Sequence, residues 1–342
     1  MKKLRLLPFL ILALIACDKE KEQSPSITFN AESGGVYISN EGNFQASNSS
    51  INYYYPSSGA SAGNVFEYVN KRPLGDICQS MNVIDGKIYL VVNNSGKIEV
   101  CETLSMKNTA TISGLTSPRY IVQAGPAKAY VSDAYAGNIS IIDLMANTVS
   151  GTIVFPGWSE QMLLKNGNVY VASPESEYLY MIDANTDAIA DSILIGKGAS
   201  ALAEDKDGKL WVICWADYLG TYDGSLFRIN PISRQSEMHL SFASGVNPSR
   251  LCMNPAGDTL YYLNSGVFRM SIYDTSLPSA PFVASNSNNY YALGVDPNRN
   301  EVYVSDAIDY IQRGKVIRYD AAGNELTNFI VGKIPGEFLF IP

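Results

Sequence analysis

The sequence predicts an all-β fold, a seven-bladed β-propeller built of four-stranded antiparallel blades. A strand pattern centred on an aromatic residue occurs seven times, at intervals of about forty to fifty residues. Repeats of this length are typical of propeller blades, and helix signals are nearly absent after the N-terminal segment. The central aromatic residues are Tyr37, Tyr89, Tyr130, Tyr170, Trp211, Tyr261 and Tyr303. Seven copies therefore predict seven blades.

The repeat between residues 117 and 154 shows how one blade is organised. Alternating apolar residues predict four strands, at Arg119–Gln123, Lys128–Asp133, Ile139–Asp143 and Val149–Val154. The third strand of several repeats ends in Asp or Asn. We interpret this as turn chemistry, because these side chains hydrogen-bond to their own backbone and end strands.

The two ends of the chain are expected to complete one blade together. Gly336–Ile341 has the pattern of an innermost strand but no second strand follows it, whereas Val36–Ser39 has no innermost strand before it. We expect the C-terminal strand to pair with the N-terminal blade, which closes the ring and leaves only short edges. The repeat, best preserved in Ala129–Asp143 and Glu301–Ala307, resembles the YVTN propeller family. This resemblance covers Gly34 to the C-terminus and implies a fold rather than an activity.

The N-terminal segment predicts export and lipidation. Basic residues precede an apolar run, Leu6–Ala16, which is too short to span a bilayer but is typical of a signal peptide. The run ends in Leu-Ile-Ala-Cys17, which resembles a bacterial lipobox; a truncated membrane anchor is the alternative. We expect a signal peptide over residues 1–16, a lipidated Cys17, a flexible tether over residues 17–33 and the propeller over residues 34–342.

The charged residues after Cys17 predict where the protein is displayed. Asp18–Glu22 resembles the surface-export signal of Bacteroidota lipoproteins. This implies a cell-surface lipoprotein of the outer membrane, held to the membrane by its lipid anchor only. Display on the periplasmic side is the alternative.

Composition argues against nucleic-acid binding and against common catalytic centres. The net charge is −8 and no basic stripe is present. The single histidine, His239, lies in a predicted outer strand, so histidine-based metal sites and nucleophile systems are disfavoured. Asp205–Gly208 resembles the start of a calcium loop but is interpreted as a hairpin turn. We predict no enzyme activity, no metal site and no cofactor. Four cysteines in apolar strands are expected to be buried thiols, with one disulfide as the alternative: Cys78, Cys101, Cys214 and Cys252.

Aromatic and polar residues are expected to gather on one face of the ring. In a propeller, the loops from second to third strand and from fourth to first strand open on the same face. The predicted ligand-binding residues of this face are Tyr135, Trp158, Tyr178, Trp215, Tyr218, Tyr222, Tyr291, Tyr310, Arg119 and Arg250. The residues expected around the mouth of the central channel are Gln79, Arg119, Glu160, Ser200, Arg250, Ala292 and Glu337.

Such a surface suits a bulky polar ligand or a partner protein, because Tyr and Trp supply large, stiff contact areas. Two alternatives remain. Some of the aromatic residues could pack between blades, and the charged residues could neutralise one another.

The whole arrangement resembles the BtuG cobalamin-binding lipoproteins of gut Bacteroidota. The resemblance lies in the lipobox and acidic tether, the opening Gly35–Phe44, the second repeat Val65–Val100 and the closing strand. It implies that the protein captures cobalamin or a related corrinoid as a transported ligand and delivers it to a TonB-dependent outer-membrane transporter. It assigns no individual site residue. The alternative is a surface adhesion or interaction propeller that binds a glycan or a protein.

Overall fold

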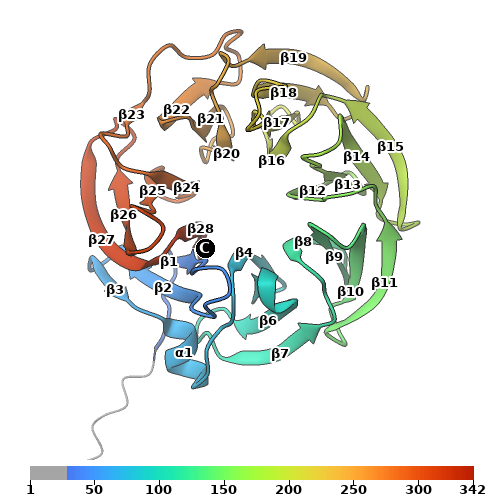
Figure 1. Cartoon of the computed structure of the whole chain (residues 1–342). Coiled ribbons are helices and arrows are strands. Elements are labelled where there is room, and N and C mark those ends of the chain that lie inside the picture. The colour runs from blue at the N-terminus through green and yellow to red at the C-terminus, as the bar shows by residue number, and fades with distance from the viewer. Residues whose placement is uncertain (1–28) are drawn as a thin grey trace, which may run out of the picture.

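Seven four-stranded antiparallel sheets surround a central axis in the computed structural model, which describes residues 29–342 (Figure 1). The predicted seven-bladed propeller is therefore confirmed. The predicted signal peptide and the lipidation site at Cys17 lie outside the described residues. Within the described range, no helix has the length and apolar character needed to cross a bilayer.

The blades are numbered here in chain order, with strands given from the axis outward. Blade 1 contains β28 (Pro335–Phe340), β1 (Val36–Asn40), β2 (Ser50–Tyr55) and β3 (Ala60–Ala62). Blade 2 contains β4 (Cys78–Ile84), β5 (Lys87–Val92), β6 (Lys97–Glu102) and β7 (Asn108–Ser113). Blade 3 contains β8 (Pro118–Gly125), β9 (Lys128–Asp133), β10 (Asn138–Asp143) and β11 (Thr148–Val154). Blade 4 contains β12 (Met162–Lys165), β13 (Asn168–Val171), β14 (Tyr178–Asp183) and β15 (Ala188–Leu194).

The remaining three blades follow the same order. Blade 5 contains β16 (Ala199–Glu204), β17 (Leu210–Cys214), β18 (Ser225–Asn230) and β19 (Gln235–Ser241). Blade 6 contains β20 (Ser249–Met253), β21 (Thr259–Leu263), β22 (Gly266–Ser271) and β23 (Val283–Ala284). Blade 7 contains β24 (Tyr290–Val295), β25 (Val302–Asp306), β26 (Arg313–Tyr319) and β27 (Glu325–Lys333). A short helix, α1 (Val65–Asn70), and a 3-10 turn, η1 (Asn93–Ser95), complete the described elements.

The ring closes as the sequence predicts. The C-terminal strand β28 pairs antiparallel with β1, with Tyr37 opposite Leu339. The closure extends beyond the strands, because the Gly34 amide donates to the Ile341 carbonyl at 2.8 Å and the Ser33 hydroxyl donates to the Pro342 carbonyl at 2.5 Å. Residues 33 and 34, which precede β1, are thus hydrogen-bonded to the last two residues of the chain, just after β28.

The aromatic residue at the centre of each repeat explains why the pattern recurs. All seven of these side chains are buried. Each belongs to an apolar cluster that includes residues of the next blade: Tyr89 clusters with Ile121 of blade 3, and Tyr303 with Ile38 of blade 1. Full burial of one such side chain stabilises the fold by about 1.5–3 kcal/mol. Each interface between blades therefore requires one large residue at the same point of every repeat.

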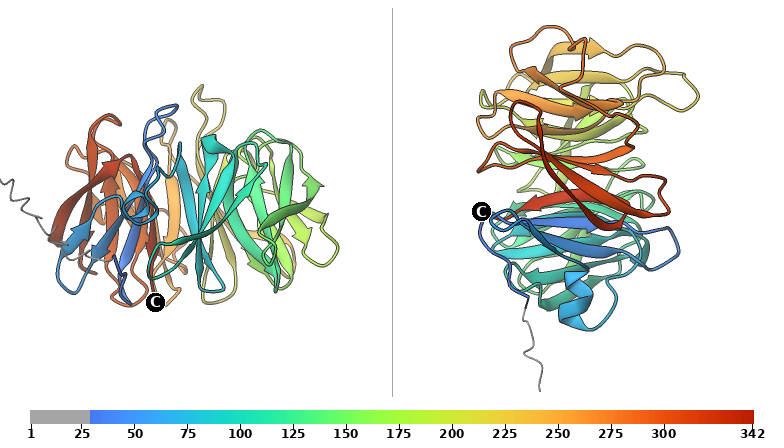
Figure 2. Two further views of the ribbon diagram at one scale, coloured as in Figure 1. Left: turned by 90° about the horizontal axis from the view of Figure 1, so that it is seen from below. Right: turned by 90° about the vertical axis from the view of Figure 1, so that its left-hand side faces the viewer.

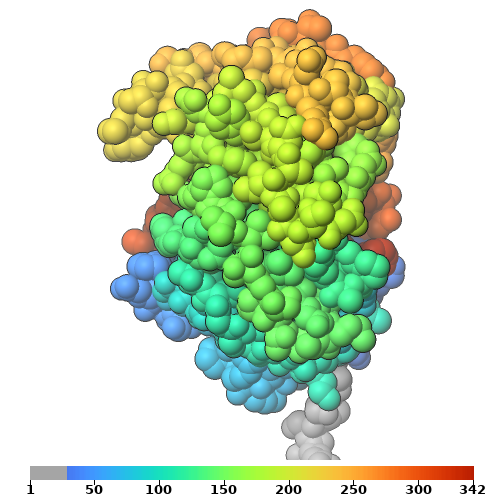
Figure 3. Space-filling view, turned by 90° about the vertical axis from the view of Figure 1, so that its right-hand side faces the viewer, coloured from blue at the N-terminus to red at the C-terminus, as the bar shows by residue number. Residues whose placement is uncertain are grey.

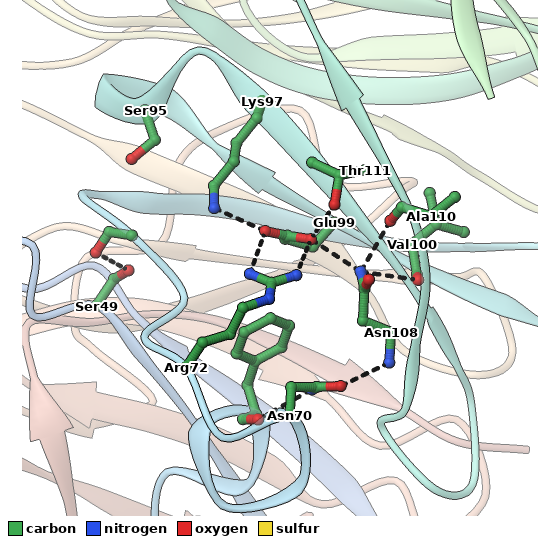
Figure 4. Close-up of polar contacts among 12 residues, drawn as sticks. Ser49, Asn70, Arg72, Ser95, Lys97, Glu99, Val100, Asn108, Ala110 and Thr111 are labelled. Carbon is green, nitrogen blue, oxygen red and sulfur yellow. Dashed lines mark hydrogen bonds and ion pairs between the residues drawn. The ribbon is translucent and has the colours of Figure 1, made fainter.

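Blade 2 also contains a buried ionic network that fixes the connection between α1 and β4 (Figure 4). The carboxylate of the fully buried Glu99 of β6 accepts hydrogen bonds from Nη1 and Nη2 of Arg72, both at 2.8 Å, and from the Lys97 ammonium at 2.6 Å. Thr111 and Asn108 donate to the same carboxylate at 2.7 and 2.8 Å. Burial acts to raise the pKa of Glu99, but these hydrogen bonds outweigh it and hold the pKa below its usual value. Since every lone pair region is occupied, the network is structural.

The turns at the ends of the third strands confirm the interpretation of their Asp and Asn residues. The Asp143 carboxylate accepts from the amides of Met145 and Ala146 at 2.8 and 2.9 Å. Side chains that accept backbone bonds in the same way are Asp183, Asn230 and Asp320. These residues shape tight turns.

The four cysteines of the propeller are free thiols, as predicted. Cys78, Cys101 and Cys214 are buried and Cys252 is half-buried. Burial raises the pKa of Cys101, Cys214 and Cys252 to about 12. Protonated, enclosed thiols of this kind are unreactive.

Candidate ligand-binding site

One face of the ring carries loops that project well beyond the sheets, while the other carries compact turns (Figure 2). A cavity of about 790 Å³ opens on the projecting face, at the mouth of the central channel. All seven blades contribute to its lining. Of the predicted ligand-binding residues, six line this cavity: Tyr135, Trp215, Tyr291, Tyr310, Arg119 and Arg250.

The innermost strands begin with irregular pairing, and this turns side chains toward the cavity. Register shifts interrupt the pairing beside Gln79, Ser200 and Arg250, and Arg250 adopts a positive φ of 55°. A bulge of this kind re-aims a side chain that regular alternation would direct elsewhere. In blade 7 the shift lies between Tyr290 and Leu293.

The predicted position of Ala292 on the channel mouth is therefore wrong. Ala292 is buried and does not line the cavity, whereas its neighbour Tyr291 does. The prediction assumed that every innermost strand begins in regular alternation, and the bulge breaks that assumption.

Arg119 is held in a fixed cluster on one side of the cavity. Its guanidinium forms a bidentate pair with Glu160, through Nε at 2.8 Å and Nη2 at 2.6 Å, and also donates to the Gln79 side chain. The Trp158 indole donates to the same Glu160 carboxylate at 2.7 Å and lies 5.6 Å from the Arg119 guanidinium. Arg119 and Glu160 thus neutralise each other, and Trp158 acts as a support for this pair rather than as a cavity wall.

Arg250 lies in a second cluster with more acidic than basic groups. Its Nε donates to the Tyr291 carbonyl at 2.9 Å and its guanidinium lies 5.1 Å from the Tyr291 ring. The Tyr291 hydroxyl donates to both carboxylate oxygens of Glu41 at 3.0 Å. Burial raises the pKa of Glu41, and burial raises the pKa of Glu337 to about 8 despite a hydrogen bond from the Met81 amide.

Gly336 explains how two carboxyl groups come together here. A Cβ at this position would lie 2.6 Å from Oε1 of Glu41, so only glycine leaves room for that carboxyl group beside Glu337. Glu41 therefore packs directly against the residue that precedes Glu337.

A second cavity of about 520 Å³ adjoins the first and is formed by the hairpin over residues 215–223. Tyr218 and Tyr222 line it, together with Asp217, Asp223 and Gly245. Trp215 and Asn247 line both cavities. The space-filling view shows the hairpin as a yellow projection from the ring (Figure 3). Two of the predicted residues thus belong to a neighbouring space rather than to the central one.

Tyr178 is the predicted site residue that lies apart. It lines neither of these cavities, and the centre of its ring lies 6.4 Å from the centre of the Tyr180 ring. His239 lies on the outermost strand β19, as predicted, and stacks on Phe227 at 4.3 Å. Among residues 29–342, no group of three or more His, Cys, Asp or Glu side chains could hold a metal ion.

Sequence reasoning did not single out several lining residues. Asn93 and Asn94 follow a second strand, in a loop that opens on the cavity face. The loop rule that placed Tyr135 on this face applies to them equally. The signal was therefore available for the loop that contains Asn93 and Asn94.

Comparison with known proteins assigns a family. The DUF5074 profile matches residues 34–332, nearly the whole propeller. The chain belongs to the DUF5074 family. This family is described as a domain of unknown function. The DUF5074 propeller matches no curated protein.

Several solved structures are similar to this DUF5074 propeller. A quinonprotein alcohol dehydrogenase-like protein from Bacteroides thetaiotaomicron has a TM-score of 0.71 and 17% identity, covering 91% of this chain and 79% of that one. A protein from Lactobacillus plantarum has a TM-score of 0.69 and 11% identity, covering 91% and 100%. Dihydro-heme d1 dehydrogenase NirN in complex with DHE has a TM-score of 0.59 and 9% identity, covering 91% and 76%. At these identities the likeness shows the fold alone.

Proposed function

We propose that this DUF5074 propeller is a non-catalytic surface lipoprotein that captures cobalamin or a related corrinoid and delivers it to a TonB-dependent outer-membrane transporter. The observation that carries the proposal is the central cavity of about 790 Å³, lined by all seven blades. Its size lies within the range of about 300–1,000 Å³ typical of sites that enclose organic ligands.

The chemistry of the lining matches an amide-fringed macrocycle. Gln79, Asn93, Asn94, Gln161 and Asn247 bring side-chain amides to the cavity, and an amide can both donate and accept hydrogen bonds. Gln161 and Asn247 use their oxygens within the protein, whereas Asn93 and Asn94 use their nitrogens. The primary amides around a corrin ring have the same dual character. At the rim, the largely exposed Tyr135 offers a flat face to the macrocycle.

The charges of the cavity favour recognition by hydrogen bonding over recognition by net charge. Arg119 is already paired with Glu160, and Arg250 lies among Glu41, Glu337 and Tyr291. The histidine His239 is on an outermost strand, away from the axis. Binding of a corrinoid at this site therefore does not depend on a bond between histidine and cobalt.

The position of the chain entry supports display of the cavity toward a partner. Ser33 and Gly34 contact the last residues of the chain, at the end of β28 that lies opposite the cavity. Lipidation at Cys17, surface display and docking on a transporter are parts of the proposal that rest on the N-terminal sequence and on the resemblance to the BtuG lipoproteins.

Isothermal titration calorimetry of the purified lipoprotein with cyanocobalamin and with cobinamide tests the proposal. We expect saturable binding of both ligands with one ligand per chain, and weaker binding of both by Trp215→Ala. Tyr273→Ala is the matched control, because Tyr273 is an exposed tyrosine that contacts Lys206 on the opposite face. Absence of heat with both ligands at high protein concentration contradicts the proposal.

The exposed tip of the hairpin favours a second candidate, an adhesive propeller. Tyr218 and Leu219 are almost completely exposed there, and exposed apolar groups of this kind mark interaction sites. Binding to an array of glycans or to a surface protein, without binding of either corrinoid, would favour this function.

A further inference from the structure

The central cavity and the hairpin cavity form one continuous bipartite surface. Trp215 and Asn247 line both spaces and lie at the border where the two spaces adjoin. The two spaces differ in chemistry. The central cavity is rich in amide and charged groups, whereas Trp215, Tyr218 and Tyr222 give the hairpin cavity an aromatic lining.

The base of the hairpin is held rigidly against the neighbouring loops. The Trp215 amide donates to the Gly198 carbonyl at 2.9 Å, and a Cβ on Gly198 would lie 2.2 Å from the Trp215 carbonyl oxygen. The Ala216 amide donates to Oδ1 of Asn247 at 3.1 Å. On the inner side, the Trp215 ring meets the Trp158 ring edge to face at 5.9 Å. The wall between the two cavities is therefore fixed in place.

The hairpin itself is closed by its own polar residues. The Asp217 carboxylate accepts from the amide of Thr221 at 2.7 Å and from its hydroxyl at 2.5 Å. The Asp217 amide donates to the Tyr222 carbonyl at 3.2 Å. Asp217 thus stabilises the conformation of the loop. The aromatic residues of the loop are therefore held in place before a ligand binds. Preorganisation of this kind lowers the entropic cost of binding.

An aromatic lining selects a particular class of ligand group. Tyr and Trp rings stack well on flat, apolar or heteroaromatic groups and give adaptable, rigid contacts. Tyr218 is fully exposed, so a group that enters the hairpin cavity would remove its ring from water.

We propose that the hairpin cavity is a second subsite, which takes a planar heteroaromatic arm of a ligand whose amide-bearing body occupies the central cavity. The proposal rests on the proposed function and names the part of the ligand that the hairpin recognises. Cobalamin carries such an arm in its benzimidazole nucleotide, and cobinamide has the same corrin body without it. Tyr218 and Tyr222 are therefore specificity-determining residues for complete corrinoids.

Calorimetric titration of the full-length lipoprotein with cyanocobalamin and with cobinamide tests this assignment in four forms: wild type, Tyr218→Ala, Tyr222→Ala and the opposite-face control Tyr273→Ala. We expect both hairpin variants to weaken cyanocobalamin binding by about tenfold, the factor that corresponds to the loss of an aromatic contact of about 1.4 kcal/mol. Their affinity for cobinamide should stay within about twofold of wild type, and the control should bind both ligands normally.

The outcomes separate this inference from the proposed function. If wild type binds both ligands and the hairpin variants bind cyanocobalamin as tightly as wild type, the second subsite is wrong and corrinoid capture stands. Equal losses of affinity for cyanocobalamin and cobinamide, in variants with wild-type circular dichroism, also contradict the second subsite, because the hairpin would then contact the corrin body that both ligands share. If wild type binds neither ligand, the proposed function fails and the subsite fails with it.

Discussion

The two faces of this propeller solve different problems with the same residue types. On the face of tight turns, acidic side chains are engaged in local bonds: the Asp205 carboxylate accepts from the amides of Asp207 and Lys209 at 2.9 Å and from the indole of Trp211 at 2.9 Å. On the cavity face, Glu41 and Glu337 lie beside one arginine, Arg250, in an enclosed space. The turn face uses side chains such as Asp205 to shape its turns, whereas the cavity face gathers charged and amide side chains around an open space.

This difference shows how a repeat fold separates stability from binding. The central aromatic residues and the Asx turns, which stabilise the blades, occupy the blade interfaces and one face. The loops of the other face are then free to vary in length and composition. Substitutions on the two faces should therefore separate into effects on unfolding and effects on affinity.

The largest effect is expected on the turn face, at Asp205. Asp205 is buried and accepts from Trp211 and from Nε of Arg228 at 3.2 Å. Asp205→Ala leaves both donors without this partner, so we expect the free energy of unfolding to fall by about 3 kcal/mol. Guanidinium denaturation measures this, and the folded fraction should bind cyanocobalamin normally.

Asp207→Ala is the matched control for this substitution. Asp207 is exposed and lies 3.4 Å from the same arginine, so its removal should change stability by less than about 1 kcal/mol. A weakened affinity in Asp205→Ala at unchanged stability would break the separation between the faces.

The next effect is a pH dependence that comes from the cavity face. The folded-state pKa of Glu337 is about 8 and its ordinary value is 4.5. Between these values the folded protein keeps a proton that the unfolded chain releases. Stability therefore falls as the pH rises from about 5 to about 8, by at most about 1.4 kcal/mol per pH unit from this group.

Glu337→Gln isolates that contribution. The amide keeps an oxygen that can accept from the Met81 amide but carries no titratable proton. Denaturation at pH 5, 6, 7 and 8 should show a smaller slope in the variant. Identical slopes in wild type and variant would mean that Glu337 is ionised in the folded protein.

A smaller effect is expected at Trp158, whose indole donates to Glu160 of the Arg119 cluster. Trp158→Phe removes the bond from the indole nitrogen to Glu160 but keeps an aromatic ring beside Trp215. We expect a loss of about 1.5 kcal/mol in unfolding free energy, because the lost bond has a charged acceptor. Thermal or chemical denaturation measures the change, and an unchanged stability would show that Glu160 is held by Arg119 alone.

The smallest effect on stability is expected at the rim. Tyr135 is largely exposed, so Tyr135→Ala should change the free energy of unfolding by less than about 0.5 kcal/mol. Its affinity for cyanocobalamin should fall by roughly fivefold, which corresponds to about 1 kcal/mol of lost aromatic contact. Calorimetry checks the second value, and an affinity equal to wild type would place Tyr135 outside the ligand contact.

The sequence predicts the ring better than it predicts the site, and there is a physical reason. Tyr89 or Trp211 occupies one environment that recurs at every interface between blades, so the period alone reveals it. The cavity depends on local departures from the repeat. In blade 7 a bulge places Tyr291 rather than Ala292 in the cavity lining, and the alternation of apolar and polar residues does not predict this bulge.

The pairing of charges follows the same rule. Arg119 and Glu160 begin adjacent innermost strands, so mutual neutralisation was among the expected alternatives, and the structure brings them together. The close approach of Glu41 to Gly336 joins residues nearly three hundred positions apart in the sequence and requires that Gly336 has no side chain. A single sequence does not reveal such a contact, because it depends on ring closure and on one glycine.

Hydrogen–deuterium exchange of the lipoprotein with and without cyanocobalamin tests the central claim most directly, that one face binds and the other only closes the fold. The account predicts slower exchange at the starts of the innermost strands, around Gln79, Arg119 and Tyr291, and in the hairpin over residues 215–223. It predicts unchanged exchange in the opposite turns at residues 143–147, 205–209 and 320–324. Protection of those turns, or saturating ligand without protection at the cavity, would contradict it.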